Sequence, residues 1–71
     1  MNLSDRIIQA EQRFFEEHLE RPNVIIMRPD IKTELQEEDG MSYFDDLDSY
    51  EGMTVAVTFD QTFPDFKVGV V

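Results

Sequence analysis

The chain has 71 residues, with 16 acidic and six basic side chains and a formal net charge of -10 at pH 7. We expect residues 1–71 to form one domain, and one core of this size rarely supplies more than about 3–5 kcal/mol of stability. The absence of cysteine excludes a disulfide framework and a thiolate metal site, and it favours a reducing, cytoplasmic setting. The negative charge opposes direct binding to nucleic acid or to an anionic membrane, so the expected partners are basic or neutral proteins.

Charged residues also interrupt the apolar stretch near the first residue, where Asp5 and Arg6 precede two isoleucines. No run of 18 or more apolar residues occurs anywhere in the chain. The sequence therefore predicts neither a signal peptide nor a membrane span.

The first predicted element is a helix from residue 4 to about residue 20. Apolar side chains recur along it at helical spacing, and polar side chains occupy the opposite side. Ser4 or Asn2 can cap its start, and Pro22 ends it because proline lacks an N–H and disfavours a helical residue before it. The apolar stripe comprises Leu3, Ile7, Ala10 and Phe14, widened by Ile8, Phe15 and Leu19.

A buried strand and a second helix are expected next. The apolar run from Val24 to Met27 is rich in β-branched residues and is bounded by prolines, which predicts a strand over residues 23–27. Pro29 suits the first turn of a helix, and Asp30 lies near the positive end of its dipole. These two residues predict a helix over residues 29–37.

An acidic loop over residues 38–52 is predicted to follow. A turn signal, Asp39-Gly40, stands at its start, and Gly52 stands at its end. From Glu37 to Glu51 the chain has seven acids, three aromatic residues and no lysine or arginine. Burying such a segment is unfavourable, because each desolvated carboxylate costs several kcal/mol unless it is paired.

Alternating apolar residues over 53–59 and 66–71 predict two more strands. The link between them, residues 60–65, is short, so we expect residues 53–71 to form a C-terminal β-hairpin. A strand, a helix and a further strand favour parallel pairing of residues 23–27 with the strand that begins at 53. The predicted fold is α/β (α+β), with the order α-β-α-β-β, a three-stranded mixed sheet and the helices packed on one face.

The charge is divided unevenly along the chain. Residues 1–35 carry a net charge of -2, whereas residues 36–71 carry -8 and have Lys67 as their one base. If the acids of the second half lie together on the surface, their field steers that surface toward a basic protein. Aromatic residues among the acids can then anchor the interface. The alternative is a solvated loop that maintains solubility. The predicted partner-binding residues are Glu37, Glu38, Asp39, Tyr43, Asp45, Asp46, Asp48, Tyr50 and Glu51.

Motifs for catalysis or cofactor binding are weak. His18 is the single histidine and lies at the edge of the helical stripe, and the serines lack the context of a nucleophile elbow. The run Asp45-Asp46-Leu47-Asp48 is of the kind that binds hard cations, but an EF-hand loop starting at Asp46 needs glycine where Glu51 stands. The glycines are too far apart for a phosphate-binding loop. We therefore predict no enzyme, no cofactor and no metal site.

Residues 23–71 join an apolar strand, a proline-initiated helix and two further strands. The motif Val24-Ile25-Ile26-Met27-x-Pro29 precedes a short helix with Leu35, and Gly52-Met53-Thr54-Val55-Ala56-Val57-Thr58 precedes Pro64 and a strand from Phe66 to Val71. This pattern resembles the strand-helix-loop-hairpin segment of tailed-phage major capsid proteins. The resemblance implies a similar local topology and a place among small phage-encoded proteins.

Taken together, these features predict a small acidic, non-catalytic protein-binding module. Its expected partner is a basic protein of the nucleic-acid-binding kind, and the resemblance implies a phage-encoded inhibitor or nucleic-acid mimic in a host cytoplasm. The alternative is a structural, self-associating module related to phage particle assembly. An unpaired strand that ends at Val71 is a template for a second copy, so we also expect a homodimer.

Overall fold

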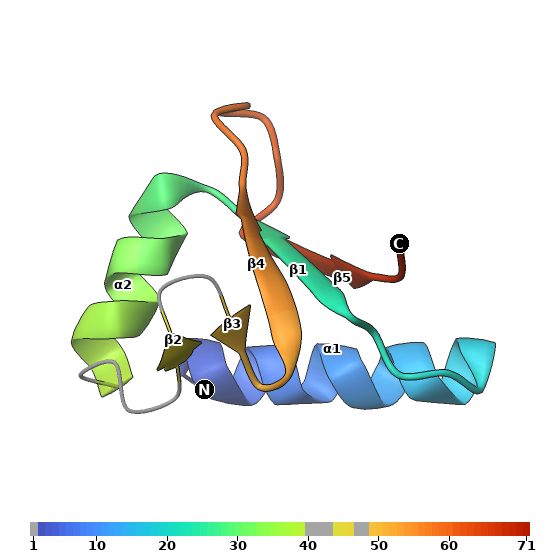
Figure 1. The fold of residues 1–71 in the computed structure, drawn as a ribbon. Coiled ribbons are helices and arrows are strands. Elements are labelled where there is room, and N and C mark those ends of the chain that lie inside the picture. Colours follow the sequence, from blue (N-terminus) through green and yellow to red (C-terminus); the bar gives the residue numbers. More distant parts are fainter. Residues whose placement is uncertain (1, 40–43, 47–48) are drawn as a thin grey trace.

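The computed structural model describes residues 2–39, 44–46 and 49–71, which form two helices and five short strands. In chain order the elements are α1 (Leu3–His18), β1 (Val24–Met27), α2 (Pro29–Asp39), β2 (Phe44–Asp46), β3 (Ser49–Tyr50), β4 (Met53–Val57) and β5 (Phe66–Gly69) (Figure 1). The Cα radius of gyration is 11.5 Å, where about 11 Å is expected for a compact chain of this length. The prediction of a small α+β domain with two helices and a mixed sheet is confirmed.

The sheet has the strand order β2-β3-β4-β1-β5. β1 is parallel to β4, with Ile25 opposite Val55, and antiparallel to β5, with Ile25 opposite Val68. β3 lies antiparallel to β4 on its other side, and β2 forms that edge of the sheet. The strand-helix-strand unit β1-α2-β4 is therefore parallel, as the sequence predicted.

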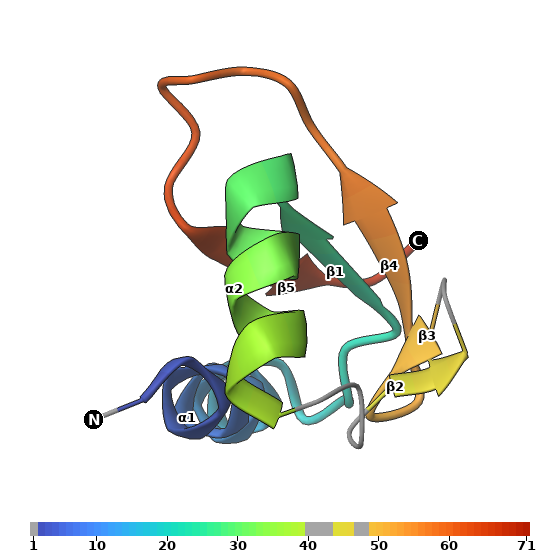
Figure 2. The same ribbon diagram turned by 90° about the vertical axis from the view of Figure 1, so that its left-hand side faces the viewer.

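The prediction of a C-terminal hairpin is wrong. β4 and β5 are not neighbours, because β1 lies between them. The eight residues 58–65 that connect these strands exceed the two to five residues that are usual in a hairpin loop. They carry the chain past the end of β1 to its far side (Figures 1 and 2). Every position of β1 is apolar, and its residues alternate between partly buried and buried.

The segment predicted as an acidic loop contains regular structure. α2 continues to Asp39, and β2 and β3 then pair antiparallel with Phe44 opposite Tyr50. The sheet thus has five strands where three were predicted. Strands of two or three residues offer too few positions for an alternating pattern, so periodicity did not reveal them.

Local hydrogen bonds set the two ends of α1. The Asn2 side chain caps its start, since Oδ1 accepts a hydrogen bond from the Asp5 N–H at 2.9 Å. At its end, Leu19 adopts a left-handed conformation with a φ of 54°, and its N–H donates to the Phe15 carbonyl at 2.7 Å. The helix therefore stops at His18, before the position predicted from Pro22. The Leu19 side chain, predicted in the apolar stripe, is 82 % exposed.

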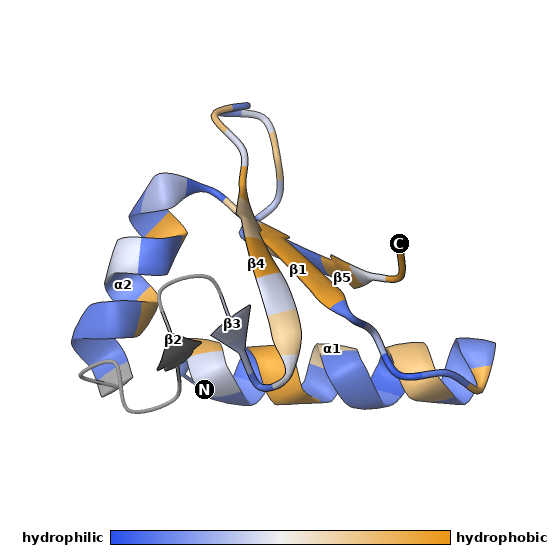
Figure 3. Cartoon of the chain, in the orientation of Figure 1, coloured by the Kyte–Doolittle hydropathy of each residue, from blue (hydrophilic) through white to orange (hydrophobic). Residues whose placement is uncertain are grey.

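Both helices contribute to one hydrophobic core on one face of the sheet, as predicted. The buried cluster joins apolar residues of α1, α2, β1, β3 and β4, and Phe66 and Val68 of β5 pack against it. Apolar and polar residues alternate along both helices (Figure 3). Only the beginning of the predicted stripe of α1 enters this core. The buried residues are Leu3, Ile7, Ile25, Met27, Ile31, Leu35, Tyr50, Met53 and Val55.

Arg28, which follows β1, holds the 58–65 link in place. Its Nη1 donates to the Phe63 carbonyl at 2.6 Å, and its guanidinium contacts Asp30 at 3.1 Å and Asp65 at 3.3 Å. Arg6 of α1 also pairs with Asp65, at 3.0 Å. Because surface ion pairs contribute little to stability, the main effect of these contacts is to fix the path of the link and the entry to β5.

Two adjacent isoleucines of α1 test this packing. Ile7 is 0 % exposed and Ile8 is 40 % exposed. We expect Ile7→Ala to lower the free energy of unfolding by about 2–5 kcal/mol, because it opens a cavity in the core, and Ile8→Ala to lower it by less than about 1 kcal/mol. Urea denaturation followed by circular dichroism measures both. Equal losses for the two variants would contradict the orientation of α1.

Candidate functional site

The structure separates the predicted partner-binding residues into different environments. Tyr43 and Asp48 lie outside the described residues. Asp39 is the last residue of α2, and Asp45 and Asp46 belong to β2. Two of the predicted acids are thus on the edge strand of the sheet and not in an irregular loop.

Tyr50 belongs to the core and not to the surface. Its side chain is 0 % exposed and packs in the buried cluster that includes Met53. Successive residues of a strand point to opposite faces, so an aromatic residue beside acids can face inward. The prediction of Tyr50 as an exposed interface anchor is therefore corrected.

Glu38 connects the two helices. Its carboxylate accepts hydrogen bonds from the backbone N–H of Leu3 at 3.1 Å, from the backbone N–H of Ser4 at 3.2 Å and from the Ser4 hydroxyl at 3.2 Å. Desolvation raises the pKa of Glu38, but the hydrogen bonds from Ser4 and Leu3 lower it, and the net shift is downward. This carboxylate satisfies free N–H groups at the start of α1. Glu38 thus has a structural role in the fold, and its predicted contact with a partner stays a prediction.

Glu51 lies in the two-residue turn between β3 and β4. Glu51 and Gly52 have φ angles of 53° and 78°, the combination of a type I′ hairpin turn. Glycine and asparagine are the residues that favour the first of these positions. The turn places the exposed Glu51 opposite α1.

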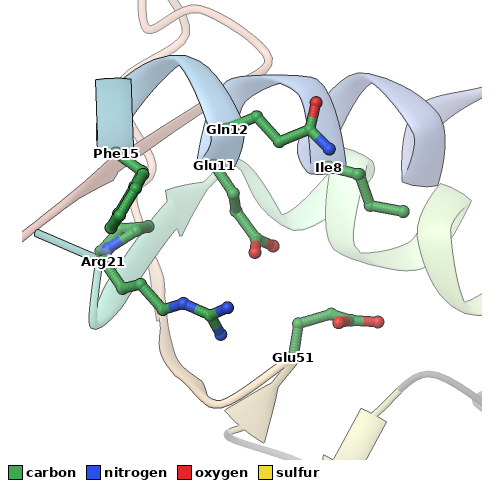
Figure 4. A pocket seen from close by; sticks show the side chains of 7 residues that line it. Ile8, Glu11, Gln12, Phe15, Arg21 and Glu51 are labelled. Atoms are coloured by element: carbon green, nitrogen blue, oxygen red, sulfur yellow. The ribbon is translucent and has the colours of Figure 1, made fainter. Parts of the chain in front are cut away.

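A cleft of about 360 Å³ opens between α1, the chain after it and the β3–β4 turn. Glu11 and Arg21 point toward the same space, and Glu51 borders that space from the turn (Figure 4). Apolar groups complete the wall, among them Phe15, which is 48 % exposed. The lining residues are Ile8, Glu11, Gln12, Phe15, Arg21, Pro22 and Glu51.

The electrostatics of this cleft are unbalanced, with two acids beside one base. Desolvation raises the pKa of Glu11 above its ordinary value, the nearby charge of Glu51 raises it further, and Arg21 opposes both effects. A carboxyl group with a raised pKa binds its proton more tightly in the folded chain, so the charged form of Glu11 destabilises the fold at neutral pH. Such an arrangement attracts a cation.

Sequence reasoning did not find Glu11 and Arg21. One signal was present, because Glu11 lies three residues after Ile8 and four before Phe15 and so shares their side of the helix. The approach of Glu51 had no such signal, since it depends on a two-residue strand and its turn. Long-range charge pairs of this kind appear only with the fold.

The single histidine and the possible metal ligands were also located in the described part of the chain. His18 stacks on Phe14, with ring centroids 4.3 Å apart, and is not among the residues that line the cleft. Within the described ranges, no group of three or more histidine, aspartate or glutamate side chains is arranged to hold a metal ion. In the same ranges, no helix has both the length and the apolar composition needed to cross a membrane.

Comparison of the chain with known proteins found no matching family model, no matching curated protein and no matching solved structure. The resemblance of residues 23–71 to a capsid-protein segment stays a prediction that rests on the sequence pattern.

Two adjacent glutamates of α2 test the assignment of Glu38. Glu38→Gln should lower the melting temperature at pH 7, because it removes the charge that accepts hydrogen bonds at the start of α1. Glu37→Gln removes the same charge from an exposed neighbour and should leave the melting temperature nearly unchanged.

The pH dependence gives a second readout for the same pair. A carboxylate with a lowered folded-state pKa stabilises the fold above its unfolded-state pKa, and this stabilisation disappears as the pH falls through the folded-state pKa. The difference between the parent and Glu38→Gln should therefore be greatest near neutral pH and vanish in acid. A difference that is absent at pH 7 would contradict the capping role.

Proposed function

We propose that the protein is a non-catalytic binding module that docks on a basic surface of another protein. The docking surface is the acidic edge, which we define as residues 44–46 and 49–51 on β2, β3 and the turn to β4. It includes the predicted residues Asp45, Asp46 and Glu51 and adjoins the cleft.

Support for this proposal comes from the positions of the charges in the sheet. The acidic edge is at the β2 side, whereas Lys67 lies on β5 at the opposite side. Arg6 and Arg28 pair with Asp65 just before β5, so these two bases do not neutralise the acidic edge. The domain therefore has a negative side whose field extends toward a partner.

The kind of partner follows from the chemistry of this side. Carboxylates on an edge strand can present negative charge in the way that phosphates do, and such charge attracts the arginines and lysines of a nucleic-acid-binding surface. Charge of this type accelerates association, and salt screens it. The proposed module thus inhibits such a partner by occupying its basic surface.

Self-association is a second candidate, and one observation favours it. The face of the sheet away from the helices carries Val24, Ile26 and Ala56, all partly exposed, and Val71 beside it is 96 % exposed. A homodimer that covers this apolar face would tolerate salt, whereas docking through the acidic edge would weaken as salt rises.

The proposal predicts a kinetic effect of the edge charges. The experiment begins with a basic protein captured at low salt by the immobilised chain, and surface plasmon resonance then measures its association rate. We expect Asp45→Asn with Asp46→Asn to slow association roughly three- to tenfold at low salt and to flatten the salt dependence. The parent chain should also compete with duplex DNA for the captured protein.

A matched control separates position from net charge. Glu16→Gln with Glu20→Gln removes the same charge from exposed positions on and just after α1 and should slow association less. If this control slows association as much as the edge variant, or if the edge variant associates at the parent rate, the acidic edge is not the docking surface.

A further inference from the structure

The cleft beside the acidic edge has a charge imbalance that the fold itself does not resolve. Glu11 on α1 and Glu51 on the β3–β4 turn face one space, into which Arg21 also points (Figure 4). In the described part of the chain, neither acid lies within 4.0 Å of a basic nitrogen, because the ion pairs there involve other acids. The cleft therefore keeps a net negative charge.

One oxygen of Glu11 also lacks a hydrogen-bond donor. Its Oε1 is buried and accepts no hydrogen bond from any described residue. Buried acceptors are nearly always satisfied in proteins, and an unsatisfied one is costly, more so when it carries charge. A donor that enters the cleft and reaches this oxygen would satisfy it.

We propose that the cleft receives an arginine side chain of the basic partner, with the guanidinium between Glu11 and Glu51 and its flat face against the Phe15 ring. This inference rests on the proposed function and names the partner group that this part of the surface binds. The ring of Phe15 and the side chains of Ile8 and Pro22 would cover the apolar stem of that arginine.

The lining favours a guanidinium over other cations. A guanidinium donates several hydrogen bonds in one plane, which allows it to bind two carboxylates at once, and it stacks on aromatic rings. An ammonium group is more strongly hydrated and does not stack in this way. A divalent metal ion prefers a set of oxygen ligands without a positively charged neighbour, and Arg21 lines this cleft.

Arg21 has a specific role in this arrangement, because it competes with the incoming arginine for the same two acids. Its charge lowers the pKa of Glu11, against the effects of desolvation and Glu51. Removing Arg21 should therefore strengthen binding of a cation, whereas removing either acid should weaken it. A cleft residue with only a structural role would not produce opposite effects of this kind.

The experiment titrates the full-length, 15N-labelled chain with N-acetyl-arginine methylamide and follows amide chemical shifts. The probe should shift amides of residues 8–15, 21 and 51, with a dissociation constant on the order of millimolar for one exposed ion-pair site. The citrulline analogue, which has the same shape without the charge, should produce no saturable shift. The lysine analogue should bind more weakly than the arginine probe.

Three variants and one control complete the test. Glu11→Gln and Glu51→Asn should each weaken binding about fivefold, and asparagine suits the positive φ of the turn, so the fold is retained. Arg21→Gln should tighten binding by a similar factor. Glu16→Gln removes a charge from the exposed side of α1 and should leave binding unchanged.

The results distinguish this inference from the proposed function. Equal shifts with the citrulline analogue, or affinities unaffected by Glu11→Gln and Arg21→Gln, would overturn the arginine site while the acidic edge still governed partner association. Shifts confined to the cleft, with opposite effects of the acid and base variants, would support the site even if the variant of Asp45 and Asp46 bound its partner at the parent rate.

Discussion

β1 pairs along both of its edges, parallel to β4 and antiparallel to β5, and the other elements take their positions from this pairing. Parallel pairing requires a crossover, which α2 supplies. With β5 on one side of β1 and β4 on the other, the chain between α2 and β4 extends the sheet at the free side of β4. The short strands β2 and β3 lie there, and with them most of the acidic segment.

Because of this arrangement, the acids that are concentrated in the second half of the sequence lie mainly on one side of the molecule. The β5 side holds Lys67 and the ion pairs of Asp65, and the β2 side holds the aspartates of the edge strand. Acids on an edge strand also discourage pairing with other chains, so the edge that we propose for docking also opposes aggregation. Glu51 belongs to the same edge and also lines the cleft beside α1. The proposed docking edge and the proposed arginine site are therefore parts of one surface.

The sequence predicts the elements with a clear period and misses those that depend on distant contacts. The apolar run of β1, the proline at the start of α2 and the alternation of β4 were enough to place these elements. The hairpin prediction failed because β1 lies between β4 and β5, and a local sequence pattern does not show which strands become neighbours. The buried position of Tyr50 was missed because its strand is too short for periodicity. The hydrogen bonds between the exposed Glu38 and the start of α1, more than 30 residues away, have no local signal in the sequence.

The central position of β1 is tested most directly by nuclear Overhauser effects between backbone protons of the labelled chain. We predict contacts from Ile25 to the strand of Val68 on one side and to the strand of Val55 on the other. β4 and β5 are two strand spacings apart, about 10 Å, so no direct contacts between their backbone protons are expected. Cross-strand contacts between β4 and β5, as in a hairpin, would contradict the account.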